Sequence, residues 1–469
     1  AGDALRPMLS RAATTLSELQ GALDQAAGPS VGASPDARER AKALTLRVTP
    51  ARDAAARAVL ALEQLPRLRV FSVAKAMKAS EVALLIGPQQ KVGGPESPSG
   101  GATGAPPSVA AISLSELLAV RSTGDAQGAG GVDLRYRAED LIAAGLSAFT
   151  PDAKPLVVFV HAGERPLAPA YNGFRAVTER LNLRGMGIAD WPAALSNSEP
   201  KEVGDARAAG RPVVYVNVSP DVRDPAGAVR MNQLAKALEA LSARGAPMLV
   251  SVNPSTLPAS GAPDPLVSWL APLGISPDSG RAIATEVTTA AGQRVTAWDE
   301  YLTEPGTRHP LGESLRGLPL RLVWPVALDL PASGAGGGPG AHVQPILVLP
   351  PGATRWGESE RLARVGGGAW VVAASINTPA SGAAPAQRLV VVGSNGWFLD
   401  VIVDRATEVD GRLVLDCPGN LELFENAVWW LAGREDRVLR SAAAEAVPLI
   451  PALSPGRLSA LQWGAVALL

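Results

Sequence analysis

The chain has 469 residues, of which 47% are hydrophobic and 19% charged, so it is long enough for a large core and about two to four structural units. Its formal net charge is −1, with no dominant basic stretch, which argues against a phosphate-tracking surface and against nucleic acid as a partner. The single cysteine, Cys417, excludes an internal disulfide framework and a cysteine-based zinc cluster.

Residues 1–65 are predicted to form an N-terminal helical region. Apolar residues between Leu5 and Leu23 recur at helical spacing, and a second stretch rich in Ala and Arg runs from about Asp36 to Leu65. Pro66 ends the second stretch because proline cannot donate the next helical hydrogen bond. We expect a helical hairpin or a stalk.

Residues 66–150 predict a small α/β segment with flexible loops. The apolar run Val82–Ile86 is typical of a buried strand, and apolar residues over 141–149 line one face of a helix. Between them, 92–107 and 124–131 are rich in Gly, Pro or Ser and lack periodicity, which indicates loops.

The main α/β domain is expected over residues 151–440, where apolar strands alternate with helices. Strands are predicted at 156–160, 213–218, 248–252, 346–349 and 389–392, and helices at 173–183, 228–243 and 265–273. Strands that are apolar throughout indicate a parallel sheet covered by helices on both faces. The stretch 282–330, richer in Thr and Val, predicts an excursion of extended segments.

A closing helix is marked near the end of this domain. Asn420 is a candidate cap, Gly433 a candidate end, and the residues between them place an apolar stripe at helical spacing. Residues 441–469 follow as a juxtamembrane segment. Its last eleven residues, from Ser459, are uncharged and mostly apolar, and we interpret them as a truncated transmembrane helix.

A search for a catalytic nucleophile fails. Gly393-Ser394-Asn395-Gly396 follows a predicted strand, but its spacing is not that of a hydrolase elbow, and no histidine comes after it. Cys417 precedes a helix that could lower its pKa, but no base is near in sequence, so we interpret it as a structural thiol.

The sequence gives no reason to expect a cofactor or a metal. His161, His309 and His342 form no metal-ligand pattern, and no phosphate-binding glycine loop follows a strand. His161 stands out because it ends a predicted parallel strand, where α/β folds bind ligands.

Acidic residues leave an alternative open. Five of them fall at or near predicted strand ends, where paired acids could cleave a glycoside: Glu164, Asp190, Asp400, Asp404 and Asp416. A carbohydrate-active hydrolase or a glycan-binding protein is therefore the alternative to a non-catalytic domain. A filamentous assembly subunit is a third reading, which rests on the helical N-terminus.

Several segments over residues 130–469 together resemble the GldG-type family, the auxiliary component of ABC transport systems associated with gliding motility. The segments that carry the resemblance are VFVHAGERP at 158–166, DPLVSWLAPLGI at 264–275, VVVGSNGWF at 390–398 and GNLELFENAVWWLAGRED at 419–436. The last two match most closely.

The resemblance implies a flavodoxin-like, class I glutamine-amidotransferase-like α/β fold that lacks the amidotransferase nucleophile. It also implies a bacterial membrane protein, with this domain facing the periplasm or the cell exterior between transmembrane helices. ABC permease and ATPase subunits are the implied partners, and homo- or hetero-oligomers are both open. We therefore expect a non-enzymatic scaffold or binding domain.

The expected functional surface is the C-terminal edge of the parallel sheet. The candidate ligand- or partner-binding residues at that edge are His161, Glu164, Ser394, Asn395 and Trp397.

Overall fold

The structure is a computed structural model of the chain, which divides into two compact units, Ala1–Lys75 and Ala76–Leu469. It describes residues 15, 19, 22–23, 34, 36, 38–48, 82–86, 109–113, 118–122, 132–136, 138–147, 153–163, 173–194, 196, 198–219, 225–289, 291–331, 342–350, 355–357, 369–380, 385–409 and 412–438.

In the first unit, residues 38–48 are helical, within the second of the two predicted helices. The remainder of that prediction lies mostly outside the described residues, and so does the expected juxtamembrane segment 441–469. Among the helices that are described, none combines the length and the apolar character needed to cross a bilayer.

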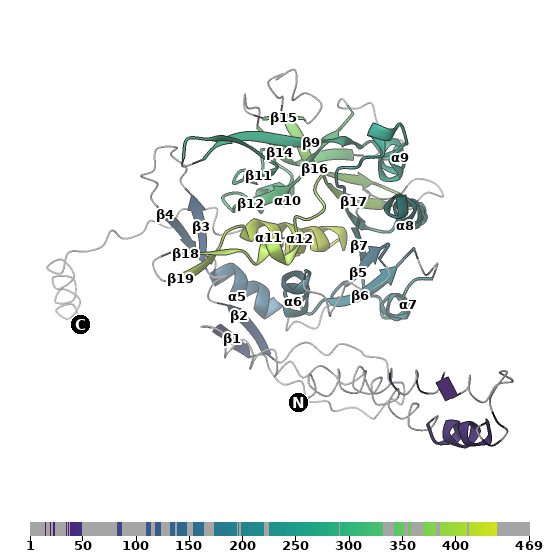
Figure 1. Cartoon of the computed structure of the whole chain (residues 1–469). Coiled ribbons are helices and arrows are strands. Elements are labelled where there is room, and N and C mark those ends of the chain that lie inside the picture. The colour runs from purple at the N-terminus through teal and green to yellow at the C-terminus, as the bar shows by residue number, and fades with distance from the viewer. Residues whose placement is uncertain are drawn as a thin grey trace, which may run out of the picture. The chain divides into compact units, whose positions relative to one another are not determined.

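The second unit is a mixed α/β structure built on a seven-stranded sheet (Figure 1). In spatial order its strands are β14 (His342–Leu349), β16 (Trp370–Thr378), β17 (Gln387–Val392), β8 (Met248–Ser251), β7 (Val213–Val218), β5 (Leu156–His161) and β6 (Gly187–Pro192). The five strands from β17 to β6 are parallel, and β16 runs against both of its neighbours. The predicted parallel sheet is confirmed, and its five parallel strands lie in the order second, first, third, fourth, fifth.

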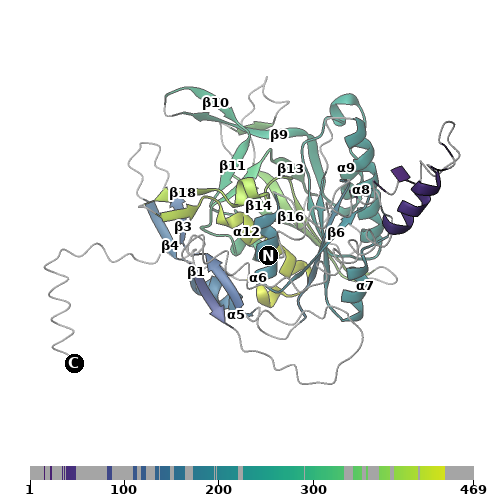
Figure 2. The same ribbon diagram turned by 60° about the horizontal axis from the view of Figure 1, so that its bottom comes forward.

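Helices cover both faces of this sheet (Figure 2). Every residue of β5 is buried, because successive side chains point to opposite faces and both faces are covered. Phe159 packs into the cluster of α6 (Arg175–Leu183) and α12 (Pro418–Leu431). Val158 packs into the cluster of α7 (Lys201–Ala208), α8 (Pro225–Ala243) and α9 (Pro265–Leu270).

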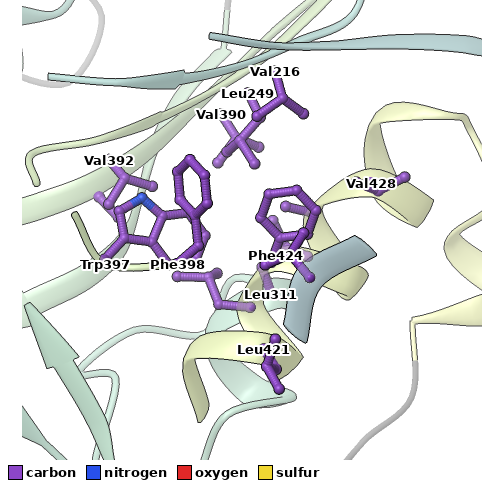
Figure 3. Packing of buried hydrophobic residues seen from close by; sticks show 14 of the residues in the cluster. Val216, Leu249, Leu311, Val390, Val392, Trp397, Phe398, Leu421, Phe424 and Val428 are labelled. Atoms are coloured by element: carbon purple, nitrogen blue, oxygen red, sulfur yellow. The ribbon is translucent and has the colours of Figure 1, made fainter. Parts of the chain in front are cut away.

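Aromatic rings fill the core on the α6 and α12 side (Figure 3). Phe424 of α12 lies at the centre, with its ring centroid 5.3 Å from Phe398 and 6.0 Å from Trp397. Such ring pairs add stabilisation beyond the apolar area they bury. The aromatic residues of the closing segment therefore anchor α12 to the end of β17.

The excursion between β8 and β14 is extended, as predicted. Its elements are β9 (Ser276–Thr288), β10 (Arg294–Ala297), β11 (Asp299–Leu302), α10 (Pro310–Glu313), β12 (Leu320–Val323) and β13 (Val326–Asp329). A later strand, β15 (Arg355–Gly357), pairs with β9. Leu302, Leu311 and Leu322 of this excursion are buried in the α12 core. The excursion is therefore part of the domain body.

Smaller sheets involve segments from before the main sheet. The predicted strand β1 (Val82–Ile86) pairs with β2 (Val109–Ser113), and α5 (Ala138–Ser147) contacts both strands. A four-stranded sheet contains β18 (Ala406–Val409), β19 (Arg412–Leu415), β3 (Leu118–Ser122) and β4 (Val132–Tyr136).

The closing helix corrects one prediction. Helix α12 begins at Pro418, with Cys417 at the N-cap position, so Asn420 is inside the first turn and does not cap the helix. Proline is favoured there because the first-turn N–H groups have no helical acceptor. Gly433 adopts φ 72°, which confirms the predicted end of the helix.

Candidate functional site

The carboxyl ends of the parallel strands meet at one edge of the sheet. His161 ends β5, Ser219 follows β7, Ser251 ends β8, and Ser394 and Asn395 follow β17. Edges of this kind bind ligands where neighbouring strands send their connections to opposite faces. Here that change falls between β5, which leads to α6, and β7, which leads to α8. Of the predicted site residues, Glu164 lies outside the described residues.

His161 is buried, with 2% of its surface exposed. Its Nδ1 accepts a hydrogen bond from the backbone N–H of Gly163 at 3.0 Å. An accepting Nδ1 carries no proton, so Nε2 is the protonated nitrogen and donates to Oδ2 of Asp190 at 3.2 Å. Asp190 is on β6, so the imidazole links two neighbouring strands, and both of its nitrogens are engaged inside the protein.

Asn395 joins the ends of two strands. Its Nδ2 donates to the carbonyl of Ser219 at 3.0 Å, and its Oδ1 accepts from the Ser219 N–H at 3.3 Å. The Ser219 hydroxyl in turn donates to the carbonyl of Ser251 at 2.9 Å. Asn217 completes the network, because its Oδ1 accepts from the Ser251 N–H at 2.5 Å. The edge is therefore tied together across β7, β8 and β17.

Trp397 is fully buried beneath this network. Its indole N–H donates to the Ser251 hydroxyl at 3.1 Å, and its backbone carbonyl accepts from Asn420 Nδ2 at 2.5 Å. Ser394, Asn395 and Trp397 are thus brought together as predicted, and Trp397 supports the edge from inside the core.

The segment after β12 covers the end of β17. The Ser394 hydroxyl donates to the carbonyl of Val323 at 2.7 Å and accepts from the Val323 N–H at 3.2 Å. The Val326 N–H donates to the carbonyl of Gly393 at 2.7 Å, and a Cβ at Gly393 would lie only 2.1 Å from the Val326 carbonyl oxygen. Only glycine allows this approach, and it leaves Ser394 with none of its surface exposed.

The acidic residues near the strand ends have structural partners. Asp400 accepts hydrogen bonds from the N–H groups of Arg175 and Ala176, at 3.0 and 2.9 Å, and so serves the first turn of α6 from another segment. Asp404 pairs with the Arg175 side chain. Burial raises the pKa of Asp404, and Arg175 partly opposes this. Asp416 binds Arg405 at 2.9 Å.

Cys417 is buried, with 1% of its surface exposed. Burial, together with the nearby charge of Asp416, raises the pKa of its thiol to about 12. The shift is opposite to the lowering that a helix N-terminus alone would cause, because loss of hydration disfavours the thiolate more strongly. This environment matches the expected structural thiol.

Sequence reasoning missed Asn217, Ser219 and Ser251, which hold this edge together. A signal was present, because Asn217 and Ser251 are the polar residues of the otherwise apolar runs VVYVNV and MLVSV. No group of three or more His, Cys, Asp or Glu residues in the described part of the chain could hold a metal ion. No known protein family matches the chain, and no relative is found among curated proteins.

Proposed function

We propose that this chain is the non-catalytic, extracytoplasmic scaffold or binding domain of a membrane-anchored auxiliary protein of an ABC transport system, similar to the GldG-type family. Its core would be a flavodoxin-like, class I glutamine-amidotransferase-like domain. The observation that carries the proposal is a parallel sheet whose C-terminal edge is held by internal hydrogen bonds.

The strand order supports the fold assignment. The order second, first, third, fourth, fifth is that of flavodoxin-like sheets. The placement of helices agrees with it, since α6 and α12 lie on one face and α7 and α8 on the other. The antiparallel strand β16 and the strand β14 beyond it extend this sheet at one edge.

The closing helix supports the resemblance, because its distinctive residues have defined structural roles. Asn420 binds the backbone of Arg321 through both ends of its amide, at 2.9 and 2.7 Å. Asn426 donates to the Ser314 hydroxyl at 3.0 Å, and the Trp430 ring lies 5.6 Å from the ring of His309. A sequence that keeps this helix keeps the same attachment of α12 to the excursion.

The geometry of the sheet edge supports a role other than catalysis. A nucleophile must be exposed to its substrate and lie within hydrogen-bonding distance of a base. Ser394 is covered and bonded to backbone groups of Val323, and His161 uses both of its nitrogens within the protein. A rigid edge of this kind suits the binding of a partner.

The test is made on the gene product in its own cells, with an epitope tag inserted in the Gly-rich segment 334–340. We expect the product to require detergent for extraction and to co-purify with an ABC permease and an ATPase. External protease should reach the tag in spheroplasts but not in intact cells with a sealed outer layer. Recovery in the aqueous fraction without transporter subunits would overturn the proposal.

A further inference from the structure

A hollow of about 470 Å³ opens on the sheet face that α7 and α8 cover, away from the hydrogen-bonded edge. One wall is a stripe of α8 on which small side chains, Ala237 and Ala240, alternate with longer ones. The opposite wall is the end of β6 and the turn after it, with Trp191 and Ala193. The hollow forms because alanines on both walls leave space that larger side chains would fill. Its volume is in the range of small-molecule sites.

The base of the hollow is apolar and held in place. The indole N–H of Trp191 donates to the carbonyl of Ser196 at 2.9 Å, so the polar group of that ring is already satisfied. Its ring lies edge-on to Tyr215, with centroids 6.4 Å apart. What the hollow offers a ligand at this end is therefore hydrocarbon surface.

The rim carries excess positive charge. Lys236 and Arg244 line it and are both exposed, and Lys236 forms no ion pair with any described residue. The carboxylate at the rim, Glu199, is bound by Arg207 at 2.8 and 3.2 Å and by Arg244 at 3.2 and 3.4 Å.

The charge of Glu199 is therefore already balanced. Partial burial opposes its ionisation, but hydrogen bonds from Arg207 and Tyr215 and the charges of Arg207 and Arg244 outweigh it and lower the pKa of this carboxyl. Glu199 stays ionised and holds the two guanidinium groups in place, while Lys236 is left facing the opening. A ligand with one negative charge would complete the charge balance.

We propose that this hollow binds a small organic acid, in which an apolar body of about the size of one ring lies against Trp191 and the alanines and a carboxylate meets Lys236 and Arg244. Carboxylate is the favoured anion because the hydrogen bonds to the two cations are charge-assisted while the apolar body is removed from water. Binding of such an acid does not depend on whether the chain serves a transporter.

The test uses ¹⁹F NMR of the 469-residue chain with 4-(trifluoromethyl)phenylacetate, and with 2-[4-(trifluoromethyl)phenyl]ethanol as the uncharged probe of similar shape. We expect the acid to bind with a millimolar dissociation constant and the alcohol at least about fivefold more weakly. Lys236→Gln should weaken binding of the acid about fivefold and leave the alcohol unchanged. Lys201→Gln removes the same charge from an exposed position on α7 that does not line the hollow, and should change neither.

Filling the hollow gives a second, independent measurement. Ala240→Leu puts a branched side chain into the space from an exposed helical position, where leucine is a good helix former. We expect binding of both probes to disappear while the circular dichroism spectrum and the thermal midpoint stay those of the parent. Equal affinity for acid and alcohol, binding that survives Ala240→Leu, or no broadening at about 10 mM acid would overturn the proposal.

Discussion

The side-chain amide of Asn395 binds both backbone polar groups of Ser219, donating to its carbonyl at 3.0 Å and accepting from its N–H at 3.3 Å. Ser219 follows β7 and Asn395 follows β17, and β8 lies between these two strands. The amide thus bridges over one strand to fix the two loops next to it. Because each atom of the amide meets a group of opposite hydrogen-bonding character, the pair also selects the orientation of that side chain.

Asn395→Asp should destabilise the protein more than its small change in size would suggest. It replaces the Nδ2 donor with a carboxylate oxygen that faces the Ser219 carbonyl, so one hydrogen bond is lost and two acceptors are opposed. We expect the free energy of unfolding to fall by about 1–3 kcal/mol in urea titrations. Asn377→Asp, at an exposed position on β16, is the control and should stay within about 0.5 kcal/mol of the parent. Equal effects of the two changes would contradict the structural role of Asn395.

Glu425 forms the centre of a buried ion cluster between α6 and α12. Its carboxylate pairs with Arg180 at 2.6 Å and with Arg184, and only 3% of its surface is exposed. Burial opposes its ionisation, but the charges of Arg184 and Arg180 and their hydrogen bonds outweigh this and lower the pKa of the carboxyl.

Glu425→Gln keeps the shape of the side chain and removes the charge that both arginines contact. Breaking a buried pair from one side leaves buried positive charge, so we expect a loss of about 3–5 kcal/mol in the free energy of unfolding. Glu202→Gln, on the exposed side of α7, should change it by less than about 0.5 kcal/mol. A stable Glu425→Gln variant would show that the cluster contributes little.

His309 should make the stability of the protein depend on pH. Its Nδ1 accepts from the Leu311 N–H at 3.2 Å and its Nε2 lies 3.0 Å from the Ser375 hydroxyl. Burial, partly opposed by Glu435, lowers the pKa of His309 from 6.5 to about 4. Between these two values the unfolded chain binds more protons than the folded chain, so stability falls as pH decreases from 6.5 to 4.

The shift corresponds to about 3 kcal/mol once the pH is below both pKa values. Urea unfolding of the parent and of His309→Gln at pH 7.0, 5.5 and 4.5 measures the effect, and the variant should lose this part of the pH dependence. His342→Gln, at an exposed position on β14, should keep the slope of the parent. If parent and His309→Gln show the same slope, His309 does not control acid stability.

Strands buried on both faces could be predicted, since their side chains are apolar throughout, as in β5 and β7. Strand β6 was missed because it is at the edge of the sheet, is partly exposed, and carries Asp190 within an apolar run. The meeting of Ser394 and Asn395 with other strand ends followed from parallel topology. The cover over Ser394 did not, because Val323 is 71 residues away in sequence and no local pattern marks that contact.

Trp324 is the one described non-glycine residue with positive φ, at 51°. Its N–H donates to the carbonyl of Trp298 at 2.8 Å, and the two indoles are stacked with centroids 5.3 Å apart, although Trp324 is 49% exposed. A side chain in this backbone region costs about 1–2 kcal/mol, which glycine avoids. The stacking and the hydrogen bond must therefore offset this strain.

Comparing Trp324→Gly with Trp324→Ala isolates the strain, because both variants lose the indole. We expect the glycine variant to be more stable in urea by about 1 kcal/mol, the reverse of the usual order. Val287→Gly and Val287→Ala, at an exposed position on β9, provide the ordinary case, in which alanine is the more stable. If alanine is also more stable at position 324, the backbone there relaxes once the indole is gone, and it is the stacking on Trp298 that imposes the positive φ.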